Sequence, residues 1–194
     1  MAAFCSVEVA NGVAGLRDIT SADIPTIVNY WILAPDEHLT SMGVDRQRIG
    51  TQEDIYRRYA NAIRTDDVRQ SNIALGITLD ERLVGYTLLN RYSDNVNYSH
   101  WHIIVPNLRA KGLSSALYPH RISVYFEVAP ILQLIHQTRT TNVGVNRMLD
   151  KFVPVSETKF VEKPDGVANP GEFHLRYVRR EDIPGIFALA AEVR

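Results

Sequence analysis

Residues 101–117 read WHIIVPNLRAKGLSSAL. An apolar, β-branched run passes into a short loop with two cations and Gly112, and a helix is expected to begin directly afterwards. The free N–H groups of a helix's first turn converge on one point, where the helix dipole adds about half a positive charge. Gly112 lets a ligand approach the backbone because it has no Cβ. The stretch therefore predicts a site for an anion, although a solvated turn would give the same pattern.

The elements expected around this stretch indicate a mixed sheet. Strands are expected at residues 16–20, 73–79, 83–90, 97–105, 131–138, 153–162 and 173–178, and helices at 21–34, 51–63, 115–127, 143–151 and 181–193. Ser21 is expected to cap the first helix, while Thr51 and Asp54 give a capping-box-like start to the second. Hairpins come first and helical crossovers later. The order predicts an α/β fold of the α+β mixed type, with a central, mostly antiparallel sheet and helices on both faces.

The chain length of 194 residues fits a single domain. Residues 1–15 are expected to form an N-terminal extension, residues 15–179 the folded domain, and residues 180–194 a C-terminal helix. The segment LRDITSADIP at 16–25 is echoed by LRYVRREDIP at 175–184. Two independent strand-to-helix units explain the echo, and so does the start of a second domain. The closing helix is expected to pack either on this domain or on a partner subunit. The second alternative implies a homodimer.

Composition argues against several classes of protein. A net charge of -1 is unfavourable for a nucleic-acid or anionic-membrane partner, because both require a cationic surface. No stretch approaches the roughly 20 apolar residues of a membrane span. Cys5 is the only cysteine, which excludes an internal disulfide and suits a reducing compartment. With no secretory leader before residue 15, a cytoplasmic location is expected.

The loop RAKGLS at residues 109–114 resembles the acyl-CoA pyrophosphate loop of the GNAT superfamily of N-acetyltransferases, written (Q/R)-x-x-G-x-(G/A). It stands between the fourth strand and the third helix, as in that family, and a similar element order covers most of residues 16–178. Residues 141–151 resemble the family's segment in which an Asn contacts the pantetheine arm. The resemblance implies acetyl-CoA as acyl donor and no metal. The cofactor-binding residues that it implies are Ile103, Ile104, Val105, Arg109, Ala110, Lys111, Gly112, Leu113, Ser114, Ser115, Asn142 and Asn146.

The sequence also departs from the family pattern. Ser114 stands where the loop usually has Gly or Ala, and residues 152–154 read FVP where Gly-Phe is usual. Met148 and Leu149 occupy the region where many members carry a Tyr that protonates the departing thiolate. These departures leave the leaving-group acid open. A non-catalytic acyl-CoA-binding module is therefore the alternative to an N-acyltransferase.

The resemblance implies direct attack of an acceptor amine on the thioester, with the oxyanion donor near residues 103–105. His100 and His102 are candidate bases, since residues two apart on a strand share a face, and simple packing between sheet and helix is the other interpretation of each. A zinc pair of these two histidines lacks a third ligand. Asp36, Glu37 and His38 lie in the expected loop that lines the family's acceptor pocket, and a solvated acidic loop is the other interpretation. The acceptor is expected to be a small molecule or an amino group of a larger one.

Overall fold

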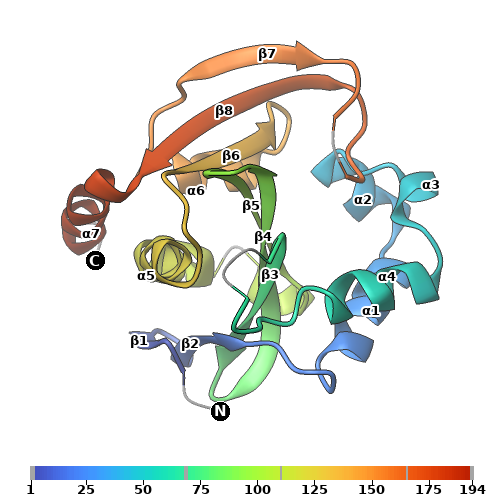
Figure 1. Cartoon of the computed structure of the whole chain (residues 1–194), viewed down its shortest axis with the longest axis horizontal. Helices are drawn as coiled ribbons and strands as arrows, with labels where there is room; N and C mark the ends of the chain where they lie inside the picture. Colours follow the sequence, from blue (N-terminus) through green and yellow to red (C-terminus); the bar gives the residue numbers. More distant parts are fainter. Residues whose placement is uncertain (1–2, 68–69, 110, 165, 193–194) are drawn as a thin grey trace.

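A computed structural model of the protein describes residues 3–67, 70–109, 111–164 and 166–192. Its centre is an eight-stranded sheet with the order β1-β2-β3-β4-β5-β6-β8-β7, shown in Figure 1. Neighbouring strands are antiparallel except for β5 and β6, which run parallel. The predicted mixed, mostly antiparallel sheet is confirmed.

The bounds of the elements agree with most of the expected ones. The strands are β1 Cys5–Val9, β2 Gly12–Asp18, β3 Asn72–Leu79, β4 Arg82–Ser93, β5 Val96–Ile103, β6 Gln133–Arg139, β7 Glu157–Val161 and β8 Gly171–Arg179. The α-helices are α1 Ile24–Ile32, α2 Asp36–Met42, α3 Arg46–Ile49, α4 Gln52–Ala60, α5 Leu113–Val128, α6 Val143–Leu149 and α7 Ile183–Glu192. Short 3₁₀ turns at Pro106–Leu108 and Arg180–Asp182 lead into α5 and α7. Within the described ranges, no helix combines the length and apolarity needed to cross a bilayer.

Helices cover both faces of the sheet, as the sequence predicted. In Figure 1, α1 to α4 lie to the right of the central strands, and α5 and α7 lie to the left. On the first face Ile27 and Ile55 pack in one cluster with Tyr86 of β4. On the second face Ile122 of α5 packs with Leu149 of α6 and with residues of β3, β4, β6 and β8. Full burial of such aliphatic side chains contributes about 1.5–3 kcal/mol each. Because both faces are covered, β3 and β4 are apolar along most of their length.

The β3–β4 hairpin fixes the register at the centre of the sheet. Its turn residues Asp80 and Glu81 have φ angles of 47° and 66°, and such left-handed two-residue turns match the twist of the flanking strands. The Asp80 carboxylate also accepts a hydrogen bond of 2.9 Å from the Val13 amide of β2. The turn therefore joins three strands.

The start of α1 differs from the expectation. The helix begins at Ile24 after Asp23, and Ser21 does not cap it. The Asp23 carboxylate accepts hydrogen bonds from the Thr20 amide at 2.8 Å and from Arg17 at 2.7 Å. These bonds hold residues 20–23 in a turn, so the helix starts later. The predicted capping box of Thr51 and Asp54 is confirmed at the start of α4.

Three elements were absent from the expected order. β1 pairs with β2 inside the segment assigned to an extension, and α2 and α3 lie in the segment 36–50 that was expected to be a polar loop. At the other end, α7 packs on α5 of the same chain and buries Ile186. The Asp182 carboxylate accepts from the Arg179 amide at 2.7 Å, much as Asp23 accepts from Thr20. The echo is thus a shared turn geometry, while the boundaries at residues 15 and 179 stay predictions.

Candidate functional site

The N-terminus of α5 has the geometry of an anion site. Gly112 precedes this 16-residue helix with φ 80°, a left-handed conformation that favours glycine, and no side chain caps the helix. The first helical bond runs from the Ala116 amide to the Gly112 carbonyl, at 2.9 Å. The amides of Leu113, Ser114 and Ser115 therefore have no acceptor within the helix. A Cβ built on Gly112 would meet nothing within 4 Å, so the helix end is open.

The loop before α5 places its two described cations differently. Lys111 is exposed next to the helix end. The Arg109 side chain turns back, so that its Nε donates to the Ile103 carbonyl at 3.0 Å and its guanidinium carbon lies 5.9 Å from the centre of the Tyr30 ring. Arg109 therefore connects the end of β5 with α1. Ala110, which was also predicted to bind the cofactor, lies outside the described residues.

Next to this loop, β5 and β6 separate. Their parallel pairing covers Val96–Tyr98 and Gln133–Ile135. Beyond it, β5 continues along β4 to Ile103, and β6 continues along β8 to Arg139. Beyond the paired residues, the facing edges of β5 and β6 no longer form hydrogen bonds with each other in the described ladder. Backbone groups on such edges can accept a further extended chain.

The end of β5 carries an irregularity in its backbone hydrogen bonds. The amides of Ile104 and Val105 both point to the Val84 carbonyl, at 2.9 and 3.4 Å. Two residues here oppose one on β4, which is the arrangement of a β-bulge. The longer bond leaves the Val105 amide less strongly engaged than that of Ile104.

Three polar side chains that are distant in sequence meet on the α1 face of the sheet. The hydroxyl of Tyr30 on α1 lies 3.1 Å from Nε2 of His38 on α2 and 3.1 Å from Nδ1 of His102 on β5. It also lies 3.5 Å from the sulfur of Met42. We call Tyr30, His38 and His102 the Tyr30 cluster. His38, expected in a loop, instead belongs to a helix that presents its ring to Tyr30.

The surroundings of the cluster keep its members neutral. Burial lowers the pKa of His102 to about 3, with smaller contributions from the two neighbouring histidines and Arg109. Burial and then Arg109 also lower the pKa of His38. Burial raises the pKa of the Tyr30 phenol. At neutral pH both imidazoles are therefore unprotonated and the phenol keeps its proton.

Aromatic packing fixes the orientation of His102. Its ring stacks on that of Tyr86 with centroids 5.1 Å apart, and it meets the edge of the Trp31 ring at 4.9 Å. The Trp31 indole N–H donates to the Tyr86 hydroxyl at 2.8 Å. His100 stands opposite Leu88, two residues from Tyr86 on β4, so the prediction that His100 and His102 share a face is confirmed. The His100 side chain is exposed, and its role as a base stays a prediction.

The two acidic candidates lie in the first turn of α2. Asp36 and Glu37 are exposed there, where negative charge is favoured by the helix dipole. Asp36 forms an ion pair with Arg46. Both carboxylates therefore belong to the segment that carries His38, at its solvent-facing start.

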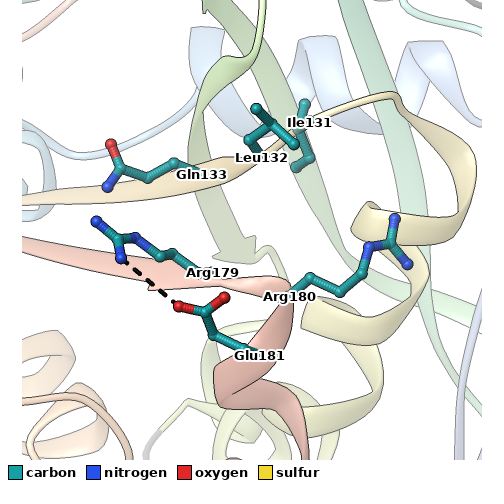
Figure 2. A pocket seen from close by; sticks show the side chains of 6 residues that line it. All are labelled: Ile131, Leu132, Gln133, Arg179, Arg180 and Glu181. Atoms are coloured by element: carbon teal, nitrogen blue, oxygen red, sulfur yellow. Dashed lines mark ion pairs between the residues drawn. The ribbon is translucent and has the colours of Figure 1, made fainter.

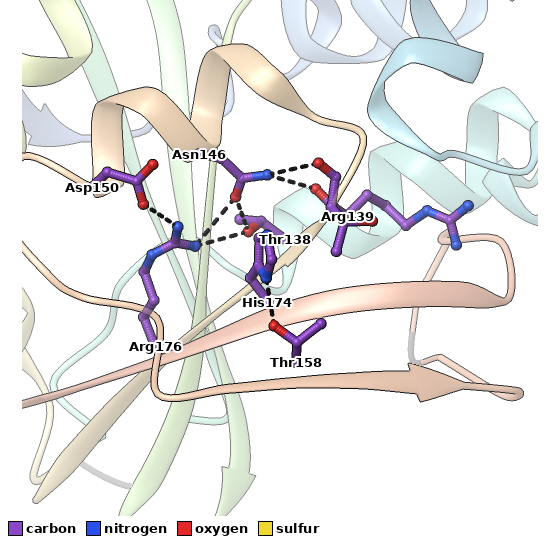
Figure 3. A network of polar contacts seen from close by, with 8 residues as sticks. Thr138, Arg139, Asn146, Asp150, Thr158, His174 and Arg176 are labelled. Carbon is purple, nitrogen blue, oxygen red and sulfur yellow. Dashed lines mark hydrogen bonds and ion pairs between the residues drawn. The ribbon is translucent and has the colours of Figure 1, made fainter.

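The two predicted asparagines belong to α6. Asn142 precedes the helix, and its side-chain oxygen accepts from the Val145 amide at 3.4 Å. Figure 3 shows that Asn146 is held by internal bonds. Its oxygen accepts from the Thr138 hydroxyl at 2.6 Å and its nitrogen donates to the Arg139 carbonyl at 2.8 Å. In this network Asn146 joins α6 to β6, and a contact between either asparagine and the cofactor stays a prediction.

The sequence matches no protein-family model and no curated protein. Several solved structures are similar. Mycobacterium smegmatis RimJ in complex with CoA-disulfide gives a TM-score of 0.74 at 15% identity, covering 98% of this chain and 94% of that one. A ribosomal-protein-S5-alanine acetyltransferase from Vibrio fischeri gives 0.70 at 14%, covering 92% and 98%. Spermidine N-acetyltransferase from Vibrio cholerae, in complex with CoA and spermine, gives 0.69 at 12%, covering 88% and 98%. The chain has the GNAT fold.

Identities this low establish a shared fold, so the chemistry of this GNAT fold has to be inferred from its own residues. On α6, Met148 and Leu149 are 8% and 0% exposed and pack in the hydrophobic core. Neither position therefore brings a proton donor to a departing thiolate. Phe152 and Val153, which replace the usual Gly-Phe, are buried in the same cluster.

This GNAT fold has two recesses in its described surface. Figure 2 shows an open one between the start of β6 and the end of β8, in which Arg179 pairs with Glu181 at 3.5 Å. It contains none of the predicted site residues. A smaller recess lies between the β1–β2 turn and the loop before α5. It is lined by Val9, Ala10, Asn11, Leu79, Leu108, Lys111 and Leu113.

Sequence reasoning missed Tyr30. An aromatic ring with a polar end often stands at the border of a buried stripe, and Tyr30 directly precedes the buried Trp31. The position of Tyr30 next to a buried residue of the apolar stripe was therefore the sequence feature that could have indicated a polar contact of its hydroxyl. The two histidine partners stand 8 and 72 residues away, and only the complete fold brings them to the phenol.

Proposed function

We propose that the protein is an acyl-CoA-dependent N-acyltransferase that transfers an acetyl group from acetyl-CoA to an amine. The observation that carries this proposal is the open N-terminus of α5 at Gly112, next to the point where β5 and β6 separate. An uncapped helix end favours a diphosphate. A diverging pair of strand edges favours an extended amide-containing arm. Coenzyme A has both parts in one molecule.

The residues around α5 have defined roles in this proposal. The amides of Leu113, Ser114 and Ser115 donate to the diphosphate, and Lys111 adds positive charge beside it. The backbone of residues 103–105 pairs with the pantetheine arm. The Val105 amide is the donor for the oxyanion, because its bond of 3.4 Å to Val84 is the easier of the two to exchange.

His102 is the proposed base. A neutral imidazole can take a proton from the acceptor nitrogen, and the low pKa of His102 keeps it neutral across the physiological range. The same low pKa means that the proton has to leave His102 again quickly. At the start of α2, Asp36 and Glu37 favour a cationic amine. A bound polyamine in one structure of the same fold is in line with such an acceptor.

The test is the release of free CoA thiol from acetyl-CoA in the presence of a panel of amines, including spermidine and a peptide with a free N-terminus. The proposal expects release that depends on the acceptor, and loss of both binding and release in Gly112→Asp. That substitution places a negative charge where the diphosphate would lie. Binding of acetyl-CoA without acceptor-dependent release would instead support a non-catalytic module. Absence of binding by the unaltered protein would refute the proposal.

A further inference from the structure

The hydroxyl of Tyr30 lies between two imidazole nitrogens but carries a single hydrogen. It is 3.1 Å from His38 Nε2 and 3.1 Å from His102 Nδ1. A phenol can donate only one hydrogen bond, so one histidine must donate to the phenol oxygen if both bonds form. The tautomers of His38 and His102 are therefore coupled through Tyr30.

Only one of the two arrangements leaves His102 able to act as a base. If His102 Nδ1–H donates to Tyr30, its Nε2 is bare and can accept a proton from the acceptor. The Tyr30 O–H then donates to His38 Nε2, and His38 carries its hydrogen on Nδ1. In the reverse arrangement His102 Nε2 already holds a hydrogen. Hydrogen bonding at one ring nitrogen of a histidine thus sets what the other can do.

We propose that Tyr30 is a relay residue, which holds His102 in its basic tautomer and passes the proton that His102 receives to His38. In this step the N–H bond of the acceptor ammonium breaks and a bond to His102 Nε2 forms. The hydrogen on His102 Nδ1 moves to the Tyr30 oxygen, and the Tyr30 hydrogen moves to His38 Nε2. His38 then releases its Nδ1 hydrogen to water. One proton enters the chain and one leaves, and the cluster then stands in the reverse arrangement. After the product leaves, water returns a proton to His38 Nδ1, the two hydrogens shift back through Tyr30, and His102 Nε2 gives its hydrogen to water, which restores the starting tautomers.

The placement of the three groups favours this direction. The His102 ring packs against the rings of Trp31 and Tyr86, and burial lowers its pKa to about 3, whereas His38 lies on the short helix α2 next to the exposed Glu37. A charge is better solvated at the second position than at the first. The remaining groups that face the cluster are Arg109, Tyr59, Met42 and His100. Since none of these is an acid that would stabilise a cation on His102, the proton is expected to move outward.

This inference rests on the proposed function, and matched variants test it. Tyr30→Phe removes the hydroxyl. His38→Gln keeps an acceptor near the hydroxyl but cannot pass a proton on. Tyr56→Phe, at a position 45% exposed on α4, is the control. We expect kcat to fall about 100–10,000-fold in the first two variants, the scale of lost proton-transfer catalysis, and to stay unchanged in the control. The wild-type proton inventory in mixed H₂O and D₂O should be curved, and that of both variants linear.

Nuclear magnetic resonance provides a readout that needs no acceptor. Long-range ¹H–¹⁵N spectra of the protein should show His102 and His38 as Nδ1–H tautomers, and Tyr30→Phe should release His102 to the Nε2–H form. An Nε2–H tautomer of His102 in the unaltered protein would overturn the relay. So would unchanged kcat and a curved inventory in both Tyr30→Phe and His38→Gln. Failure of the proposed function looks different, because the unaltered protein would then neither bind acetyl-CoA nor release CoA.

Discussion

Replacement of Gly112 by alanine separates the strain at the helix end from its binding role. Gly112 has φ 80°, and an L-residue in this conformation costs about 1–2 kcal/mol. For a chain of this length that cost lowers Tm by about 2–8 °C. The Cβ itself meets no protein atom within 4 Å, so no packing term adds to the strain. It does enter the space in which the diphosphate is proposed to lie. Loss of one amide bond to a charged oxygen costs about 1.5–3 kcal/mol, which weakens acetyl-CoA binding about 10–150-fold.

Gly166 gives a matched control for this experiment. It has φ 68°, and its Cβ would also meet nothing within 4 Å. Gly166→Ala should therefore lower Tm by a similar amount and leave the affinity unchanged. Calorimetric titration with acetyl-CoA and thermal unfolding without ligand measure the two effects separately. Equal affinities in Gly112→Ala and Gly166→Ala would refute the placement of the diphosphate at α5.

Three further predictions concern stability. Burial lowers the pKa of the fully buried His136 well below its usual value, so only the unfolded state gains this proton as the pH falls. The free energy of unfolding should drop by about 1.4 kcal/mol per pH unit below pH 6.5. Urea melts at a series of pH values should show a weaker pH dependence of this free energy in His136→Gln than in the unaltered protein. Although burial raises the pKa of Asp23, bonds from Arg17 and the turn lower it overall, so this stabilisation is present above about pH 4 and lost in more acidic solution. Asp23→Asn should cost about 1–3 kcal/mol at pH 7, and the difference should shrink towards pH 3; a constant difference would contradict the ion pair. Arg121 is 4% exposed, and its Nε and Nη2 have no hydrogen-bond partner among the described residues, although its guanidinium lies 3.9 Å from the Trp101 ring centre. Since burial of a cation costs more than the roughly 2 kcal/mol of a cation–π contact, Arg121→Met should raise Tm, and a lower Tm would show that the contact dominates.

The parts of the fold that local chemistry determines were predictable from the sequence. Gly112 and the helix that directly follows it predict the loop before α5. The positive φ of Gly112 is a conformation that glycine permits. The turn at Asp80 and Glu81 and the capping box at Thr51 are likewise set by neighbouring residues. In each of these places the interactions span only a few positions of the chain.

Other parts depend on contacts that no local pattern reveals. The segment of α2 lacks the apolar stripe that predicts a helix, because Leu39 is its only buried residue in the described structure. The start of α1 moved because Asp23 bonds to Arg17, on the preceding strand. The Tyr30 cluster joins a helix to a strand 72 residues later, and a pattern search within a short window cannot find such a pairing.

The most direct test of the account is a crystal structure of the protein with acetyl-CoA. We expect the diphosphate oxygens to lie about 2.7–3.2 Å from the amides of Leu113, Ser114 and Ser115, with the pantetheine arm between β5 and β6. A structure in which the coenzyme binds elsewhere, while this end of α5 faces only solvent, would contradict the central claim.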